Sequence, residues 1–433
     1  MKKEMKNMKD YIEDLFKIYN SAIDSYSSKV LQVINEKYTL IDKAMIATYL
    51  YIKILDELGI IENIAKDTLI NYLLKQIIYG ETGNLDLQIT NKSKEAIYKE
   101  VIDQLIIEKF AYKNRILVHL KYEYKIMPQN QYHKLIDFCE EIAEFYIMEK
   151  LILRGNTEAE IYRKEKQKKF EKDKMELNKQ DNKIAKEMWK ILEKITTNKF
   201  EDTEYKQLIE VALNLRDVYR YSTLTTIVPE NVLFHQYVMT IVSILFSQYL
   251  NKELGENFDI YKIMYKSLFH DFGEYKGNEI VTQVKNYNEE TKKMFAEMEA
   301  ADEKELENRI GHNLYEIVTN YKAEKEGYLS NLLDKIFGIM KLWVEEGYMN
   351  NLTYIKSICS IYQERFKKLK MVDKEIKNKD FLFDLLRESY IYIKEHMMKK
   401  DKELFLLYFT KEEGIEIEKE LELIKRDRNA FLA

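Results

Sequence analysis

The sequence predicts an all-α protein. The chain has 433 residues but only two prolines and 12 glycines, so the residues that usually interrupt helices are scarce. Leu, Ile, Lys, Glu and Met, which favour helices, are abundant. Hydrophobic residues make up 46% of the chain, which is enough for conventional cores and excludes a disordered protein. We therefore expect a helical chain that is long enough for two or three domains.

The composition also limits partners and location. With 69 basic and 74 acidic residues, the net charge of -5 gives no global attraction to nucleic acid or anionic lipid, so nucleic acid is possible but not favoured. The two cysteines, Cys139 and Cys359, lack any ligand spacing, which indicates free thiols in a reducing compartment. No apolar run reaches the roughly 18 residues that a membrane span needs. We expect a cytoplasmic protein with no membrane contact.

The helical periodicity divides the chain into four parts. Residues 1–156 form one helical domain, residues 157–194 a charged helical linker, and residues 367–433 a helical C-terminal extension without identifiable chemistry. Within the linker, residues 163–174 carry seven basic and three acidic side chains. This stretch is either a solvated helix or linker, or an arm that follows phosphates, and the sequence leaves both readings open. The first domain is interrupted at 79–84, around Pro128 and at 154–158.

The remaining part, residues 195–366, contains the candidate chemistry. Pro229 is followed by Glu230 and Asn231, two candidate capping residues, and then by a long apolar run. This order predicts a helix whose first turn contains His235.

Two further helices of this domain carry polar residues of interest. Residues 259–272 predict a helix with His270 and Asp271 in its last turn and Gly273 as its stop signal. A later helix with a broad apolar face contains Asp334. Each residue has an ordinary explanation by itself, because isolated histidines in apolar helices are usually packed and an aspartate can sit on a polar helix edge.

The ordered combination of these four residues is more informative. The His-Asp pair follows His235 by 35 residues, and Asp334 comes 64 residues after His270. Neighbouring helical residues differ by about 100° around the axis, so at a helix end His270 and Asp271 can both bend toward one point. Two imidazoles and two carboxylates suit a divalent transition metal with open positions. Such a metal polarises a phosphoryl group and lowers the pKa of bound water, which is the chemistry of a phosphohydrolase.

The same residues resemble the HD-domain metal-dependent phosphohydrolases, most closely the bacterial 5'-deoxynucleotidase branch, over about residues 215–346. "RYSTLTTIVPENVLFH" (220–235) is similar to the family's R-W followed by E-N-V-x-E-H. "HDFGEYKGNEIVTQVK" (270–285) is similar to its H-D-x-x-E followed by G-D-x-x-T-P-V-K, with the same number of residues between His and Lys. Asp334 and "WVEE" (343–346) are similar to its last aspartate and the E-E that closes that helix.

The resemblance implies an HD-domain helical bundle and assigns roles residue by residue. It implies metal ligands at His235, His270, Asp271 and Asp334, a catalytic carboxylate at Glu274 supported by Glu279, and substrate contacts from Arg220, Tyr221, Thr282 and Lys285. An arginine offers a bidentate fork to a phosphate, and a carboxylate can move a proton. The ligands are intact, but the surroundings depart from the family pattern at Tyr221, Phe234, Gln236, Asn278, Glu279 and Gln283.

The resemblance also bears on the number of metals. Related enzymes with two metals use extra histidines between the His-Asp pair and the last aspartate, and this chain has only His312 there. We therefore expect one divalent transition metal ion, whether Co, Mn, Ni, Zn or Fe. The Gly-Tyr-Pro signature of cyclic-dinucleotide phosphodiesterases and any P-loop are missing.

The first domain could be a degenerate HD-like copy of the second. "YGETGNLDL" (79–87) resembles "FGEYKGNEI" (272–280), and placing them in register sets two isoleucines opposite the His-Asp pair. Two aliphatic side chains cannot hold a metal, so the first copy would bind none and would act as an internal partner, making a pseudo-dimer. An unrelated helical domain is the alternative, and an oligomer of the chain is also possible. The proposed counterparts are Asp42 for His235, Ile77 and Ile78 for His270 and Asp271, and Glu141 for Asp334.

The function that this sequence predicts is hydrolysis of (deoxy)nucleoside 5'-monophosphates to nucleoside and phosphate, so the expected partner is a nucleotide substrate. Two alternatives stay open. One is an HD-type phosphodiesterase or nuclease with residues 163–174 guiding a strand. The other is a non-catalytic nucleotide-sensing regulator.

Overall fold

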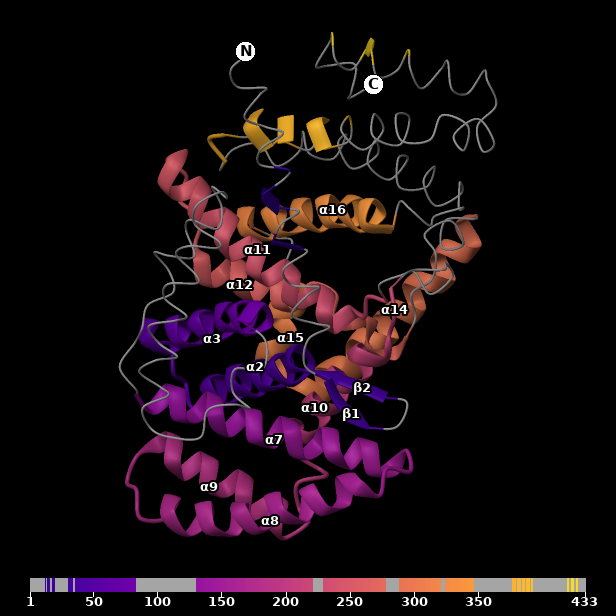
Figure 1. Ribbon diagram of the computed structural model, residues 1–433. Coiled ribbons are helices and arrows are strands. Elements are labelled where there is room, and N and C mark those ends of the chain that lie inside the picture. The colour runs from indigo at the N-terminus through magenta and orange to yellow at the C-terminus, as the bar shows by residue number, and fades with distance from the viewer. Residues whose placement is uncertain are drawn as a thin grey trace.

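The computed structural model describes five long stretches, residues 36–82, 130–220, 229–277, 288–320 and 324–345, together with residues 30–33 and scattered positions within 12–19, 376–391 and 419–426. Within these stretches almost every element is a helix, which confirms the all-α prediction (Figure 1). The exception is a short antiparallel hairpin of β1 (Val30–Val33) and β2 (Glu36–Thr39), where helix was expected. β-branched and aromatic residues in this stretch favour the extended conformation.

The hairpin leads directly into α2 (Leu40–Glu57) through a capping box. The Thr39 hydroxyl accepts a hydrogen bond from the Asp42 amide at 3.1 Å, and the Asp42 carboxylate accepts one from the Thr39 amide at 2.8 Å. These two bonds satisfy amide groups that a helix start would otherwise leave without partners. A left-handed Gly59, with φ of 62°, then separates α2 from α3 (Asn63–Thr82), a break that the sequence pattern did not predict.

Helix α7 (Gln131–Leu153) packs along α2 and begins after an Asn130 cap. It ends directly before the predicted interruption at 154–158, and α8 (Glu158–Leu177) and α9 (Lys183–Thr196) follow and pack on each other. These two helices occupy the segment predicted as a charged linker, and they lie against α7 at the bottom of Figure 1. The segment is therefore folded onto the N-terminal half.

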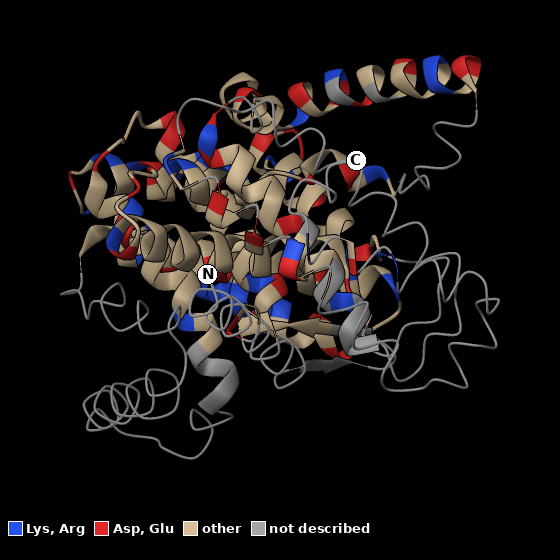
Figure 2. Cartoon of the chain, turned by 90° about the horizontal axis from the view of Figure 1, so that it is seen from above, with Lys and Arg blue, Asp and Glu red and all other residues tan. Residues whose placement is uncertain are grey.

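The basic side chains of α8 face an acidic row on α7. Arg163 pairs with Glu149 at 2.8 Å, Lys166 pairs with Glu144 at 2.9 Å, and Lys169 pairs with Glu141. Figure 2 shows acidic and basic residues interspersed along the ribbon. Because these three cations of α8 already have carboxylate partners, the pairing does not favour an arm that follows phosphates.

The second half is a bundle around α11 (Val232–Glu253), in which every residue from 232 to 250 is buried. By length and apolar composition α11 could cross a membrane, but its apolar window is completely buried, as in the core helix of a bundle. Helices α10 (Glu204–Asp217), α12 (Ile260–Leu268) and α16 (Lys325–Glu345) pack against it. The other described elements of this half are the 3-10 helix η2 (Phe272–Lys276), α14 (Glu289–Ile310) and α15 (His312–Thr319).

The two halves share one core. Helix α2 packs on both α10 and α11, and α3 also contacts α11. The buried Tyr237 hydroxyl of α11 donates a hydrogen bond to the Leu73 carbonyl of α3 at 3.1 Å. The N-terminal half is therefore in direct contact with the helix that carries His235.

The beginnings of α2 and α11 are alike, as a duplication would require. An antiparallel pairing precedes each helix, and the caps Thr39 and Asn231 occupy equivalent positions. Counting four residues from each cap places Lys43, rather than Asp42, opposite His235. A lysine is no more suitable as a ligand than the isoleucines, and the duplication itself stays a prediction.

Gly311, which joins α14 to α15, has a φ of 87°. A Cβ there would lie 2.8 Å from both Glu204 Oε2 and Lys53 Nζ, a pair that links α10 to α2. We expect Gly311→Ala to lower the free energy of unfolding by about 1.5 to 3 kcal/mol, because it adds backbone strain and disturbs an ion pair whose carboxylate is half exposed. Denaturant unfolding measures this loss.

Gly155→Ala is the matched control for that substitution. Gly155 has a φ of 93°, but a Cβ at this position would have no atom of a non-adjacent residue within 4 Å. It should therefore lose only the strain contribution of about 1 to 2 kcal/mol. Equal losses in the two variants would contradict a role for Gly311 in accommodating the ion pair between α10 and α2.

Candidate metal site

Three elements bring the four predicted ligands together. Asn231 caps α11 by accepting from the Phe234 amide at 2.7 Å, and this cap fixes the first turn that presents His235. Asp334 comes from the middle of α16. The pair His270 and Asp271 comes from the turn between α12 and η2.

The placement of the His-Asp pair corrects the sequence prediction in one detail. Helix α12 ends at Leu268, so both residues lie beyond its last turn. The chain then forms 3-10 bonds, from the Phe272 amide to the Phe269 carbonyl at 3.2 Å and from the Glu274 amide to the Asp271 carbonyl at 3.0 Å. Gly273 therefore lies within η2 and is not the stop signal. The left-handed residue that ends η2 is Gly277, with a φ of 79°.

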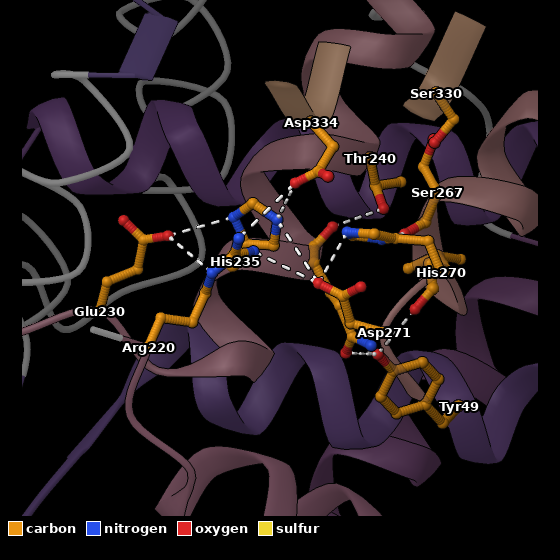
Figure 3. Close-up of polar contacts among 12 residues, drawn as sticks. Tyr49, Arg220, Glu230, His235, Thr240, Ser267, His270, Asp271, Ser330 and Asp334 are labelled. Atoms are coloured by element: carbon orange, nitrogen blue, oxygen red, sulfur yellow. Dashed lines mark hydrogen bonds and ion pairs between the residues drawn. The ribbon is translucent and has the colours of Figure 1, made fainter. Parts of the chain in front are cut away.

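The side chains converge on one point (Figure 3). One donor atom from each of His235, His270, Asp271 and Asp334 lies within 4.8 Å of the others. His235 Nε2 is 3.0 Å from Asp334 Oδ1 and 3.7 Å from Asp271 Oδ2. His270 Nε2 is 3.1 Å from the same Asp271 oxygen. Within the described stretches this is the only such group of donors.

Both imidazoles are oriented as metal-binding histidines usually are. The outer nitrogen of His235, Nδ1, lies 3.1 Å from Glu230 Oε1, and His270 Nδ1 donates to the Ser267 carbonyl at 2.7 Å. A hydrogen bond from the outer nitrogen fixes the tautomer and leaves Nε2 as a ligand. Because Nε2 of each ring faces the carboxylates, the donor set fits a divalent cation with mixed nitrogen and oxygen ligands.

Arg220 lies beside this cluster. Its amide donates to the Glu230 carbonyl at 2.8 Å, which holds the residue next to the start of α11. Its guanidinium nitrogens are 3.3 Å from Asp271 Oδ2, 3.7 Å from Asp334 Oδ1 and 3.9 Å from Glu230 Oε1. The N–H groups of the Arg220 guanidinium thus lie beside the carboxylates of the candidate metal site.

The site keeps its carboxylates ionised. Burial opposes ionisation of Asp271, but the charge and hydrogen bond of His270, together with Arg220, lower its pKa to about 2. Burial likewise opposes ionisation of Asp334, but the hydrogen bond from His235 and the charge of Arg220 hold its pKa below the usual range. Burial acts against the protonated His270, but Asp271 raises the His270 pKa to about 9. A divalent cation held by the two ionised carboxylates would displace the His270 proton, because only a neutral imidazole is a ligand.

The other predicted site residues are only partly covered by the structure. Glu274 is half-buried in η2, three residues after Asp271. Tyr221, Glu279, Thr282 and Lys285 lie outside the described residues.

Sequence reasoning missed the role of Glu230, which it named only as a candidate cap. Asn231 alone caps α11, while the buried Glu230 side chain contacts His235. Burial acts against its ionisation, but the hydrogen bond with His235 and nearby positive charges lower the pKa of Glu230 to about 2. From the sequence, either Glu230 or Asn231 could cap the helix. Only the directions of the two side chains in the structure show that Asn231 is the cap and that Glu230 contacts His235.

A helical bundle with His, His-Asp and Asp at its centre defines the HD class of domain. Residues 207–385 match the family model described as 5'-deoxynucleotidase YfbR-like, a family of HD-domain proteins, which confirms the resemblance. The matched segment includes all four residues of the cluster. Neither the search of curated proteins nor that of solved structures finds a match.

Proposed function

We propose that this protein is a metal-dependent phosphomonoesterase that hydrolyses nucleoside 5'-monophosphates, deoxynucleotides included, to nucleoside and phosphate. The observation that carries the proposal is the convergence of His235, His270, Asp271 and Asp334 on one point, inside a segment that matches a 5'-deoxynucleotidase family. The family description supports phosphohydrolase chemistry, and the four clustered side chains are suitable ligands for the metal that this chemistry needs.

The four clustered residues would hold one divalent transition metal ion. When bound, such an ion supplies Lewis-acid chemistry to the phosphoryl group. The residues around it have their own tasks. Glu230 and the Ser267 carbonyl keep the outer nitrogens of the two histidines occupied, so that each Nε2 stays directed into the site.

Arg220 is proposed to bind the phosphate. In the structure its guanidinium faces two of the carboxylates, and a phosphate could accept hydrogen bonds from the same fork. Glu274 is proposed to move the proton between water and the leaving ribose oxygen. Its position three residues after Asp271, in η2, supports this role. Glu279 is proposed to support it, and Tyr221, Thr282 and Lys285 are proposed to contact the substrate.

Phosphate release from the intact chain tests this function. The protein would be stripped with a chelator, reloaded separately with manganese, cobalt, nickel, zinc or iron(II), and given the common ribo- and deoxynucleoside 5'-monophosphates. We expect release that depends on the added metal. The 3'-monophosphates are matched controls, because they differ only in the position of the ester.

The other outcomes decide between the alternatives. Cleavage of an oligonucleotide or a bis-(nitrophenyl) phosphate with no release from monoesters would identify a diesterase and overturn the proposal. Saturable nucleotide binding without release under any of these metals would indicate a sensor instead.

A further inference from the structure

A tyrosine of the N-terminal half reaches the turn that carries the His-Asp pair. The Tyr49 hydroxyl, on α2, lies 2.7 Å from Gln236 Oε1 and 3.1 Å from the Leu268 carbonyl oxygen, so its single proton is shared between two acceptors. Figure 3 shows Tyr49 beside Asp271. Leu268 is the last residue of α12, two positions before His270. Tyr49 is completely buried, so this contact is shielded from water.

The ring of Tyr49 holds the same turn from its side. Its centroid is 5.3 Å from that of Phe269 and 4.9 Å from that of Phe272, the latter in an edge-on arrangement. These two phenylalanines are the residues directly before and after the His-Asp pair. Tyr49 therefore contacts the turn at the Leu268 carbonyl and at the rings of Phe269 and Phe272. Its fourth contact is Gln236, one of the departures from the family pattern.

A second tyrosine of the N-terminal half supports the other histidine. The buried Tyr19 hydroxyl donates to Glu230 Oε2 at 2.5 Å. The other oxygen of that carboxylate lies 3.1 Å from His235 Nδ1. Tyr19 thus holds the Glu230 carboxylate, and that carboxylate orients the His235 imidazole.

We infer that the N-terminal half is a positioning component of the metal site, with Tyr49 holding the His270–Asp271 turn and Tyr19 holding Glu230 behind His235. The inference rests on the proposed function, because it takes His235, His270 and Asp271 as ligands. Neither tyrosine is one of the clustered donors. Both act through a group that supports or carries a donor, so the N-terminal half contributes to metal affinity although it provides no ligand.

Simple packing is the competing explanation, and the chain contains a matched control for it. Tyr51 lies on the same helix, is equally buried, and donates to the Ala65 carbonyl at 2.8 Å. That acceptor belongs to the N-terminal half. Tyr49→Phe and Tyr51→Phe each remove one buried hydroxyl from α2, but only the first removes a bond to the turn of the site.

Calorimetric titration of the full chain with manganese(II) distinguishes the two explanations. Circular dichroism at the titration temperature would first establish that each variant is folded. We expect Tyr49→Phe to weaken manganese binding about tenfold, the lower end of the range for groups that orient metal ligands, and Tyr51→Phe to bind like the wild type. At a manganese concentration below saturation, phosphate release should therefore slow in Tyr49→Phe and stay unchanged in Tyr51→Phe.

Tyr19→Phe provides an independent test, and it also keeps the inference testable if Tyr49→Phe does not fold. Its control is Tyr132→Phe, which removes a hydroxyl that donates to Glu62 Oε2 at 2.5 Å within the N-terminal half. Tyr19→Phe should weaken manganese binding and Tyr132→Phe should not.

Equal manganese affinity in each tyrosine variant and its control would overturn the inference and leave the proposed function standing. A wild-type chain that binds no divalent metal would overturn both.

Discussion

Asp271→Asn is expected to abolish metal-dependent phosphate release, with a loss of at least about 1,000-fold in kcat/KM. The substitution keeps the size of the side chain but removes the charge that faces His270, His235 and Arg220. A neutral amide is a poor ligand for a divalent ion and can present its NH₂ group to the site. Steady-state phosphate release, measured with the metal that best activates the wild type, gives this loss.

Thermal unfolding separates loss of the site from loss of the fold. A metal that binds only the folded chain stabilises it by about 2.7 kcal/mol at 100 times its Kd, which raises the Tm. This metal-induced rise should disappear in Asp271→Asn. Asp302→Asn is the control, because Asp302 pairs with Lys276 at the surface, at 2.6 Å, and lies outside the cluster. Full metal-dependent activity in Asp271→Asn would disprove the ligand assignment.

Arg220→Lys is expected to lower kcat/KM by about 100-fold while metal binding is retained. Lysine keeps the positive charge but replaces a rigid fork of donors by a single ammonium, which cannot make a bidentate contact with a phosphate. In the structure the three guanidinium nitrogens each lie within 4 Å of a different carboxylate. A single ammonium nitrogen cannot occupy these three positions at once. Michaelis–Menten kinetics on the preferred 5'-monophosphate, with calorimetric titration of the metal, measure both quantities.

Arg309→Lys is the corresponding control. Arg309 pairs with Glu305 at 2.8 Å on α14, away from the cluster, and its replacement should leave kcat/KM unchanged. If Arg220→Lys instead lost metal binding and activity together, Arg220 would be a structural partner of the ligand carboxylates and not a phosphate-binding residue.

The fold and the core of the site were accessible from the sequence for local reasons. Scarcity of proline and glycine is a property of composition, and it sufficed to predict helices throughout the described stretches except at the hairpin. The position of His235 followed from the Asn231 cap, because capping depends on residues that are neighbours in the chain. The order of the four cluster residues then predicted a common site, and the structure brings them together.

Predictions that depended on where a helix ends were less successful. Gly273 was predicted as a stop signal, but the helix had already ended at Leu268 and a 3-10 segment continued to Lys276. The sequence does not distinguish a 3-10 turn from a last α-helical turn, because both have similar backbone angles and composition. The break at Gly59 was missed because an isolated glycine is also tolerated within helices.

The sequence alone determined the helical class, the first helical turn that contains His235, and the identity of the four residues that converge. Only the tertiary structure decided that Glu230 orients His235, that the basic side chains of α8 pair with α7, and that Tyr19 and Tyr49 reach the site from the N-terminal half. The physical reason is sequence separation. Caps and helical periodicity act between residues a few positions apart, whereas Tyr19 and Glu230 are separated by 211 positions and meet only because the two halves share a core.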